Sequence, residues 1–344
     1  VYSGGFELTP LCNFDCKMCY VHLTKGQMER EANLLTVQQW ISIMGQAVDA
    51  GMMHADLTGG ECLSYPGFKD VYLYLRSRGV EVSILTNGQL ITEEMADFFA
   101  QYPPSVIQIT VYGSDEDAYE AVTGRRAFGD VKAAIESLKR RNIRLFLAVT
   151  PNRYMQEDTH ALMEFLRSLD VRYGIGTGSL PARPDTGRNL ESYAPETALY
   201  VKLHLDEQRY LRGLEDSPAP ARPYVDYIPT GFHTESKIPC SSGLCAFHIN
   251  WKGEMSPCIP FHSINRSVLE HGFEDCWNWI KAQMRSYEPP KECSDCANRL
   301  VCAACPAERT SGVLGGSLNK AVCERYEQYV RAGILQIPQD DKCK

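Results

Sequence analysis

The chain lacks three features that would assign it to a membrane, to secretion or to nucleic acid. None of its apolar segments approaches the ~20 residues that a membrane-spanning helix needs. Residues 1–5 contain neither the basic nor the apolar segment of a secretory signal. The formal net charge is −8, so the sequence gives no sign of the basic surface that attracts nucleic acid or anionic lipid. We therefore expect a cytoplasmic protein that binds neither nucleic acid nor membrane.

Cysteine is absent from the middle of the chain and abundant at both ends. Fourteen cysteines occur in 344 residues, but none lies between Cys62 and Cys240, with four before this gap and ten after it. This distribution is too uneven for a disulfide framework. Clustered cysteines in a reducing compartment typically bind metal or take part in catalysis. We expect sulfur-ligated metal at both ends and an oxygen-sensitive protein of an anaerobic cytoplasm.

Cys12, Cys16 and Cys19 form the tightest cysteine group. Cubane iron–sulfur clusters are usually held by four cysteines, so three close together imply an exchangeable ligand at the last iron. An open position distinguishes a catalytic metal site from a closed structural one. A buried stripe on a helix is the alternative, which Asn13 and Asp15 disfavour because both residue types are typical of turns. The spacing predicts a catalytic four-iron cluster on a loop.

Short apolar segments of strand type alternate with amphipathic segments of helical length over residues 6–177. The predicted strands are 6–9, 55–58, 80–85, 106–111, 145–149 and 173–176, and the predicted helices are 36–49, 68–78, 91–101, 131–141 and 160–169. Six such units indicate a parallel sheet with helices outside. They fall short of the eight units of a complete barrel, so a partial barrel and an open doubly wound sheet both remain possible.

The rest of the chain divides into a connector and a cysteine-rich region. Residues 191–239 are the predicted connector, with a helix over 196–214 followed by a proline-rich stretch. From residue 240 onward cysteine and glycine interrupt the chain and few long periodic segments remain. Such a region is expected to depend on metal for its fold. The predicted limits are therefore 1–190, 191–239, 240–330 and a tail at 331–344.

Two further segments stand directly after predicted strands. Gly59-Gly60-Glu61 follows one strand, and an Asn-Gly turn at Asn87 follows the next. In parallel β/α architectures the functional loops lie at the carboxyl ends of strands. Paired glycines let a ligand approach the backbone closely, and the Glu61 carboxylate can accept hydrogen bonds from an ammonium group. Each segment alone is more often a turn, but together with the cysteine loop they indicate one site.

These features resemble the radical SAM superfamily, whose motif has three cysteines spaced as Cys12, Cys16 and Cys19 and followed by an aromatic, here Tyr20. The resemblance covers roughly residues 6–180. It implies a partial (β/α)6 TIM-like barrel and a 4Fe–4S cluster whose open iron is chelated by S-adenosylmethionine. Reduction of that cluster cleaves the sulfonium to a 5′-deoxyadenosyl radical, which abstracts a hydrogen from the substrate.

By the same resemblance, six residues would contact S-adenosylmethionine. They are Tyr20, against the adenine; Gly59, Gly60 and Glu61, at the methionyl amino group; and Asn87 and Thr110, as further polar contacts. The chemistry agrees, because a sulfonium cation is attracted to a thiolate-ligated cluster. Its amino and carboxylate groups can supply the missing iron ligands and so place the C–S bond beside the electron source.

A second group contains eight cysteines that all follow residue 239. They are Cys240, Cys245, Cys258, Cys293, Cys296, Cys302, Cys305 and Cys323. Their C-x-x-C pairs suit tetrahedral zinc, but the two pairs are closer together than the ~15–20 residues of a zinc ribbon. Eight cysteines also suit two fully ligated 4Fe–4S clusters.

This region resembles the SPASM domain, which follows the barrel in many radical SAM enzymes. The resemblance implies two auxiliary clusters, one nearer the active site and one farther from it. The nearer would be held by Cys240, Cys245, Cys258 and Cys305, and the farther by Cys293, Cys296, Cys302 and Cys323. Cys302 and Cys305 are one residue closer than the pattern usually has, which leaves open a three-coordinate nearer cluster with an open iron.

Three cysteines fit neither pattern: Cys62, Cys276 and Cys343. We expect them to be buried or incidental thiols. Cys62 has an alternative, since it directly follows Glu61 and would then face the bound cofactor.

SPASM-containing enzymes divide mainly into maturases of ribosomally made peptides, anaerobic sulfatase-maturating enzymes and a few small-molecule dehydrogenases. In sulfatase maturases an Asp directly after the residue equivalent to Cys258 is expected to act as base, and here that residue is Ile259. Residues 251–258 look like the corresponding segment of peptide thioether maturases. We therefore expect a radical SAM peptide maturase that forms a thioether or carbon–carbon cross-link. The other two enzyme classes, an iron–sulfur electron carrier and a zinc-stabilised binding protein are the alternatives.

The expected partners are a precursor peptide and a reducing electron donor such as flavodoxin or ferredoxin. The sequence shows no leader-binding domain, which would lie upstream of Val1, be a separate protein or be absent. The catalytic acid or base and the identity of the substrate are not determined by these patterns.

Overall fold

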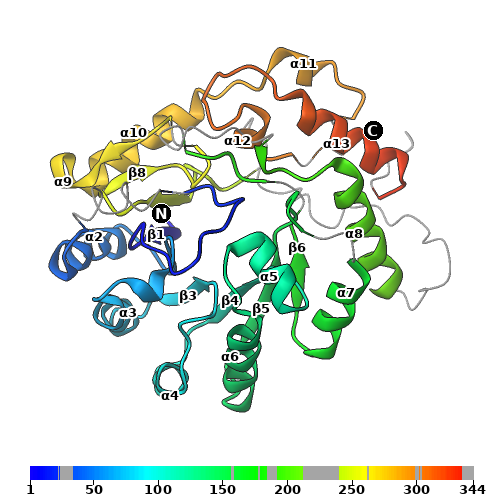
Figure 1. Cartoon of the computed structure of the whole chain (residues 1–344). Helices are drawn as coiled ribbons and strands as arrows, with labels where there is room; N and C mark the ends of the chain where they lie inside the picture. The colour runs from blue at the N-terminus through cyan, green and yellow to red at the C-terminus, as the bar shows by residue number, and fades with distance from the viewer. Residues whose placement is uncertain are drawn as a thin grey trace.

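One nine-stranded sheet organises the protein, with strand order β6-β5-β4-β3-β2-β1-β7-β8-β9 (Figure 1). This computed structural model describes residues 1–21, 23, 34–155, 159–176, 179–183, 192–211, 240–261, 263–298, 302 and 304–334. Strands β6 to β7 in that order are all parallel, and β8 and β9 are added antiparallel. The first six strands are neighbours in chain order, so the order does not reverse among them.

The six barrel strands alternate with helices. The strands are β1 (Ser3–Glu7), β2 (His54–Thr58), β3 (Glu81–Thr86), β4 (Val106–Val111), β5 (Leu145–Val149) and β6 (Tyr173–Ile175). The helices between them are α2 (Val37–Asp49), α3 (Phe68–Ser77), α4 (Glu93–Gln101), α5 (Glu116–Thr123), α6 (Phe128–Arg140) and α7 (Thr159–Ser168), with a 3-10 turn at η1 (Cys62–Ser64).

The predicted partial barrel is confirmed, and the doubly wound alternative is wrong. A doubly wound sheet reverses its strand order at a switch point and so carries helices on both faces. Here successive right-handed crossovers run in one direction, which places the helices on the outer side of a curved sheet (Figure 1). The inner side of the sheet is left free to line a site.

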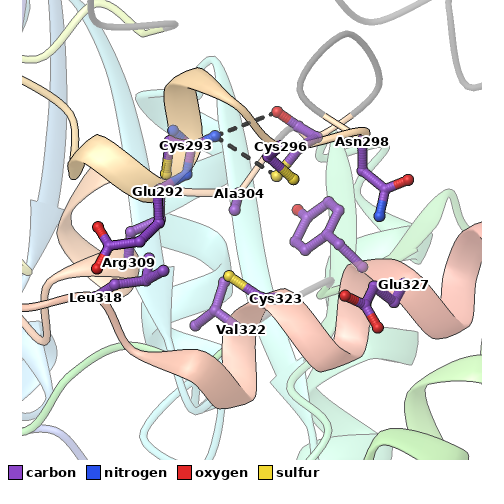
Figure 2. A pocket seen from close by; sticks show the side chains of 12 residues that line it. Glu292, Cys293, Cys296, Asn298, Ala304, Arg309, Leu318, Val322, Cys323 and Glu327 are labelled. Atoms are coloured by element: carbon purple, nitrogen blue, oxygen red, sulfur yellow. Dashed lines mark hydrogen bonds between the residues drawn. The ribbon is translucent and has the colours of Figure 1, made fainter.

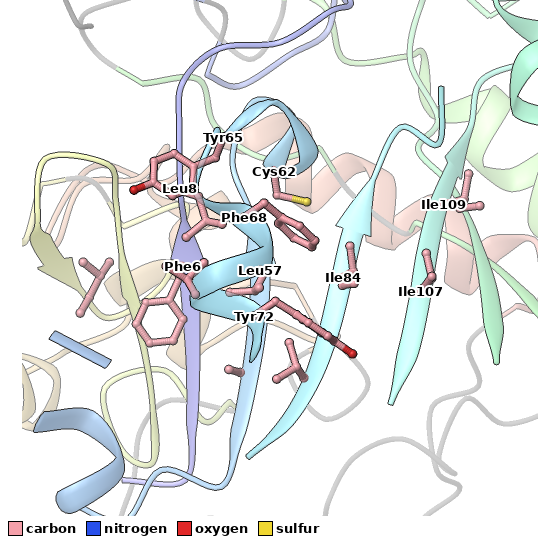
Figure 3. Packing of buried hydrophobic residues seen from close by; sticks show 14 of the residues in the cluster. Phe6, Leu8, Leu57, Cys62, Tyr65, Phe68, Tyr72, Ile84, Ile107 and Ile109 are labelled. Atoms are coloured by element: carbon pink, nitrogen blue, oxygen red, sulfur yellow. The ribbon is translucent and has the colours of Figure 1, made fainter. Parts of the chain in front are cut away.

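Local sequence explains where the helices begin and which side they bury. Thr36 caps α2 through a reciprocal capping box with Gln39, which satisfies free N–H groups of the first turn. Helix α3 buries Phe68 and Tyr72 against the strands, and Figure 3 shows both beside Leu57 of β2. Burying each such aromatic side chain stabilises the fold by about 2 kcal/mol.

The region after residue 240 continues the barrel sheet. β7 (Ala246–Ile249) pairs in parallel with β1, and β8 (Glu254–Ser256) and β9 (Arg266–Ser267) extend it. Four helices follow: α9 (Val268–His271), α10 (Phe273–Arg285), α11 (Lys291–Ser294) and α12 (Pro306–Arg309), before α13 (Lys320–Arg331). Two of these helices, α10 and α13, are long and have a buried face each. The predicted domain limits remain predictions, and the sheet runs across the one at residue 240.

A buried ion pair between two C-terminal helices also contacts the segment that follows β6. Arg325 Nη2 of α13 lies 2.8 Å from Glu308 Oε2 of α12, and both side chains are buried. Glu308 Oε1 also accepts a hydrogen bond from the Ser179 N–H at 3.1 Å. The Ser179 hydroxyl in turn contacts the hydroxyl of Tyr200, on α8 (Thr197–Leu211), at 2.7 Å.

Two sequence predictions concern the connector. The predicted helix over 196–214 is present as α8, whereas the proline-rich stretch at 212–239 lies outside the described residues. Among the helices of the described part, none has the length and apolar character needed to cross a bilayer.

Candidate active site

Cys12, Cys16 and Cys19 lie on the loop that follows β1, not on a helix, and line one cavity of about 30 Å³ together with Gly60. Burial raises the pKa of Cys12 to about 12, and the charges of Glu61 and Cys19 add to this effect. Burial, followed by the charges of Cys19 and Cys12, raises the pKa of Cys16 well above its ordinary value. Three neighbouring thiolates in such a place need positive charge to be stable, which iron supplies.

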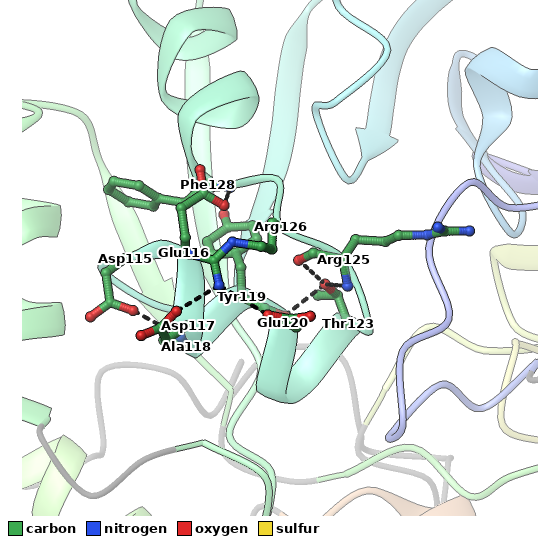
Figure 4. A network of polar contacts seen from close by, with 10 residues as sticks. All are labelled: Asp115, Glu116, Asp117, Ala118, Tyr119, Glu120, Thr123, Arg125, Arg126 and Phe128. Atoms are coloured by element: carbon green, nitrogen blue, oxygen red, sulfur yellow. Dashed lines mark hydrogen bonds and ion pairs between the residues drawn. The ribbon is translucent and has the colours of Figure 1, made fainter.

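Helix α5 holds this loop in position. The N–H of Asp15 donates to the carbonyl of Thr123 at 2.9 Å, and the N–H of Lys17 donates to the carbonyl of Val122 at 2.9 Å. Figure 4 shows Thr123 at the C-terminal end of the helix, where carbonyl groups have no partner within the helix. The sequence analysis missed α5, although it supplies the carbonyls that fix the cysteine loop.

The two glycines after β2 are required by a close approach to the cysteine loop. A Cβ added at Gly59 would lie 2.5 Å from Thr9 O, and one at Gly60 would lie 2.5 Å from Leu11 O. These approaches allow the Gly60 N–H to donate to Thr9 O at 2.7 Å and the Glu61 N–H to donate to Leu11 O at 2.8 Å. The Gly-Gly pair therefore seats the cysteine loop against β2.

Both carboxylate oxygens of Glu61 accept hydrogen bonds from inside the chain. One carboxylate oxygen accepts from Thr86 Oγ1 at 2.8 Å and the Leu63 N–H at 3.1 Å, and the other accepts from the Asn87 N–H at 2.8 Å. Burial raises the pKa of Glu61, and these hydrogen bonds oppose that rise. The carboxylate thus joins the ends of β2 and β3, a role that the sequence did not reveal.

Asn87 makes a second connection, to the cysteine loop itself. Its side-chain Nδ2 donates to Asn13 Oδ1 at 2.8 Å and lies 3.8 Å from Cys12 Sγ. Asn87 therefore stands beside the predicted cluster ligands. Thr110 lies one strand farther away, on β4 opposite Ala148 of β5.

A larger cavity of about 270 Å³ lies at the ends of β1, β7 and β8. Tyr20 faces it and donates a hydrogen bond from its hydroxyl to Glu7 Oε1 at 2.9 Å. His248 of β7 faces it too, with Nε2 3.9 Å from Glu7 Oε2. Ile259 is also in its wall, next to Cys258. Tyr20 thus stands between the cysteine loop and this cavity.

The sequence analysis missed Glu7, Arg183 and His248, which all line the larger cavity. A charged residue within an otherwise apolar strand was the available signal for Glu7, and a histidine after the cysteine-rich boundary was the signal for His248. Neither signal is specific, because only the pairing of β1 with β7 brings these two side chains together.

Four cysteines of the second group line one cavity of about 90 Å³: Cys293, Cys296, Cys302 and Cys323 (Figure 2). Helix α11 carries Cys293 and α13 carries Cys323, so the chain returns to close the set. Burial raises the pKa of both of these thiols, and the charges of the other cysteines add to it. Arg309 Nη2 donates to Cys302 O at 3.3 Å and to Cys302 Sγ at 3.6 Å, which places a cation beside the sulfurs.

Cys240, Cys258 and Cys305 form a second set. Burial raises the pKa of Cys258 to about 12, and the charges of Cys305 and Cys240 add to it. The charge of Cys240 also reaches Cys305, whose pKa is raised by burial. Cys245 lies in the turn that follows Cys240, where its N–H donates to Ser241 O at 3.1 Å. Cys305 thus lies with the predicted nearer set despite its short spacing from Cys302.

Among the described residues, no three His, Cys, Asp or Glu side chains converge as they would on one metal ion.

Two of the unassigned cysteines are core residues. Cys62 is fully buried and its thiol donates to Leu85 O at 3.4 Å, among the core side chains of Figure 3. Cys276 is also buried, and its thiol donates to Ser267 O at 3.3 Å. The expectation of buried thiols is confirmed for both, whereas Cys343 lies outside the described residues.

Residues 6–166 match the family described as the radical SAM superfamily, which spans the cysteine loop and β1 to α7. Residues 6–166 form a radical SAM domain. The chain is therefore a radical SAM enzyme, whose cofactors include S-adenosylmethionine and a 4Fe–4S cluster.

Curated relatives of this radical SAM enzyme include peptide-modifying proteins. The sporulation killing factor maturation protein SkfB of Bacillus subtilis is 24% identical over 298 residues, which cover 86% of this chain and 68% of SkfB. A PqqA peptide cyclase of Streptomyces rochei is 23% identical over 292 residues, which cover 82% of this chain and 75% of the cyclase.

A solved structure shares the whole architecture. Streptococcus suis SuiB, in a crystal structure with its precursor peptide SuiA, superposes with a TM-score of 0.71 at 16% sequence identity. The match covers 94% of this chain and 75% of SuiB. At this identity the likeness shows the fold, a partial barrel followed by the cysteine-rich region.

Proposed function

We propose that this radical SAM enzyme oxidatively modifies a ribosomally made peptide, with a thioether or carbon–carbon cross-link as the product. The observation that carries this proposal is a large polar cavity whose wall contains Tyr20, next to Cys19, and Ile259, next to Cys258. The relatives support it, since SkfB is named a maturation protein, the cyclase acts on the PqqA peptide and SuiB binds a precursor peptide. A reducing donor such as flavodoxin or ferredoxin would supply the electron.

Cys12, Cys16 and Cys19 would hold the catalytic cluster. When bound, S-adenosylmethionine supplies the 5′-deoxyadenosyl radical that abstracts a hydrogen from the peptide. Gly60 shares the cavity of the three cysteines, so the methionyl end would lie there, and Tyr20 would lie against the adenine. Gly59, Glu61, Asn87 and Thr110 complete the proposed set, with Glu61 and Asn87 acting also by holding the strand ends together.

Two auxiliary 4Fe–4S clusters would occupy the C-terminal cysteine sets. Cys293, Cys296, Cys302 and Cys323 share one cavity, which suits a fully ligated cluster. Cys240, Cys245, Cys258 and Cys305 would ligate the other, at the end of the substrate cavity marked by Ile259. A cluster held by these cysteines would supply an acceptor for the further electron that a cross-linked peptide must lose.

The iron content tests the assignment of the clusters. Protein purified without oxygen should contain about twelve irons per chain, since three clusters hold four irons each. The variant with Cys12, Cys16 and Cys19 all replaced by Ala should lose about four of them and form no 5′-deoxyadenosine. The matched control is Cys276→Ala, which changes a buried core thiol and should keep both. Zinc in place of iron, or cofactor cleavage by the triple variant, would refute the proposal.

Sulfatase maturation is the second candidate, and the cavity weighs against it. The position where that class places a carboxylate base holds Ile259, whose side chain cannot accept a proton. Mass spectrometry of the cognate peptide after anaerobic incubation separates the two. A loss of two hydrogens with a new cross-link in the fragment spectrum supports the maturase, whereas conversion of a single residue to formylglycine would support the alternative.

A further inference from the structure

The cavity of about 270 Å³ contains one polar atom that the protein leaves without a partner. His248 is 5% exposed, and its Nε2 is buried with no hydrogen-bond partner in the structure. Leaving a buried polar group unsatisfied is unfavourable, so such atoms in native proteins require an explanation. His248 faces the cavity and lies on β7, a rigid strand of the sheet. The atom is therefore positioned to meet a ligand.

A carboxylate stands at a distance that one ligand atom can bridge. Glu7 Oε2 lies 3.9 Å from His248 Nε2, too far for a direct hydrogen bond. This gap is shorter than two hydrogen bonds of ~2.8 Å laid end to end, so a single oxygen can reach both atoms. The neighbouring Glu7 carboxylate favours the tautomer of the neutral imidazole that carries its proton on Nε2. With that tautomer, the oxygen donates to the carboxylate and accepts from the Nε2–H. A hydroxyl group does both with one atom, whereas an ammonium group has no lone pair to accept with.

The charges around the cavity balance. Its wall contains two carboxylates, Glu7 and Glu254, and two cationic side chains, Arg183 and Lys252. Arg183 also lies over the ring of Trp251, with its guanidinium carbon 4.5 Å from the ring centroid. A charged ligand group would leave one charge uncompensated in a place removed from water, which is costly. An uncharged polar group fits this balance.

The size of the cavity limits what enters it. About 270 Å³ is several times the ~30 Å³ that one water molecule occupies in the liquid and lies just below the ~300 Å³ of the smaller ligand pockets. The cavity therefore accommodates one side chain and adjacent backbone rather than a folded peptide.

We propose that Glu7 and His248 bind the hydroxyl group of a serine, threonine or tyrosine side chain of the peptide at the end of this cavity. The inference rests on the proposed function, because it makes the cavity the place where a peptide side chain is held. Glu7 and His248 are positioning residues in this assignment, and they select a hydroxyl-bearing residue next to the cysteine loop.

Capped single residues test the inference with the anaerobically purified holoenzyme. The probes are N-acetyl amides in matched pairs, threonine with valine and tyrosine with phenylalanine, together with lysine as a charged probe. Binding is measured by ligand-observed saturation-transfer NMR. We expect each hydroxyl probe to bind about tenfold more tightly than its partner, because the partner leaves the buried polar atoms unsatisfied. The lysine probe should bind no better than the valine probe.

Three variants make the test specific. In His248→Leu and in Glu7→Gln, the two probes of each pair should bind with nearly equal affinity. His54→Leu is the matched control, and this variant should keep the preference for the hydroxyl probes. His54 lies on β2, on the other side of β1 from β7, and hydrogen-bonds Asp56 outside this cavity. Thermal unfolding checks that each variant folds, and if His248→Leu does not, Glu7→Gln and the wild-type ratios decide.

Equal affinity within the pairs, a preference that survives in His248→Leu, or tighter binding of the lysine probe would overturn the inference. Formation of 5′-deoxyadenosine by the same preparation is measured separately. If it occurs while the probes show no preference, the inference about the hydroxyl fails and the proposed radical chemistry stands. If no 5′-deoxyadenosine is formed, the proposed function itself fails.

Discussion

Gly60 shows how a single residue positions the cysteine loop. A Cβ at this position would lie 2.5 Å from Leu11 O and 2.6 Å from Pro10 O, and both are backbone atoms. Gly60→Ala must therefore move the loop that carries Cys12. We expect the variant to lose about four irons. It should form 5′-deoxyadenosine roughly 100-fold more slowly, because a misplacement of ~1 Å has effects of this size.

Gly129→Ala is the control for Gly60→Ala. Gly129 lies at the start of α6, and a Cβ there would lie 3.3 Å from Glu116 Oε1. This atom is the far end of a flexible side chain on α5. This variant should keep the iron content and the rate. Full iron content in Gly60→Ala would contradict the role given to the close approach.

His248 makes a prediction about acid stability. Burial, followed by the charge of Arg183, lowers the pKa of His248 from 6.5 to about 3, while Asp56 opposes the shift. Below pH 6.5 the unfolded chain binds a proton at His248 that the folded protein excludes, so stability falls as the pH falls from 6.5 toward 3. The slope from this group approaches about 1.4 kcal/mol per pH unit. His248→Leu removes this group and leaves Glu7 in place. The Tm of the variant should therefore fall less between pH 6.5 and pH 4.5 than the Tm of the wild type.

His54 has a shift of the opposite sign, and its effect falls in a different pH range. Its hydrogen bond to Asp56 raises its pKa above 6.5, so the stability that it contributes is present below pH 6.5 and is lost as the pH rises through the folded-state pKa. His54→Leu should therefore lower Tm at and below pH 6.5, and its difference from the wild type should shrink as the pH rises above 6.5. Parallel pH profiles for both variants and the wild type would contradict the account of both histidines.

At the scale of elements, the contact between α12 and α13 depends on one buried ion pair. Glu308 and Arg325 are 2.8 Å apart, and their side chains are 5% and 6% exposed. Glu308→Ala leaves Arg325 buried without its carboxylate, which typically costs about 3–5 kcal/mol. We expect a marked fall in Tm, measured by circular dichroism on the anaerobic holoenzyme.

The matched control is an exposed ion pair of the same chemistry. Asp117 of α5 lies 2.7 Å from Arg126 Nη1, and both side chains are more than half exposed (Figure 4). Water and salt screen such pairs, so Asp117→Ala should leave Tm unchanged within error. An equal fall in both variants would show that burial does not decide the strength of the Glu308–Arg325 pair.

For the molecule as a whole, the C-terminal region is held by two different means. β7 is buried and paired with β1, whereas α11 has four residues and none of them is buried. After the iron is removed with a chelator, hydrogen exchange should remain slow in residues 246–256 and become fast in residues 291–298. The reason is that the sheet fixes the first segment, while metal ligation would be the main constraint on the second.

The iron-loaded protein is the control, with slow exchange expected in both segments. Fast exchange in residues 246–256 after iron removal would show that the sheet depends on metal as well. Slow exchange in residues 291–298 without iron would contradict the expectation that metal maintains this part of the fold.

Sequence alone predicted the alternation of strands and helices and indicated the superfamily. Runs such as Val106–Val111 and Leu145–Val149 were predicted with their observed bounds, because a strand buried on both faces is a local apolar pattern. The spacing of Cys12, Cys16 and Cys19 specified the superfamily, since ligands on one loop must be close in sequence to reach one cluster.

Tertiary structure alone decided what surrounds the chemistry. Helix α5 spans eight residues, too few for a periodic signal, yet its last carbonyls hold the cysteine loop. Glu7 and His248 meet because β7 pairs with β1, a pairing between segments far apart in the chain. Local patterns carry the information for local structure, whereas such pairings depend on how the whole chain packs, and the proposed hydroxyl site is built from one of them.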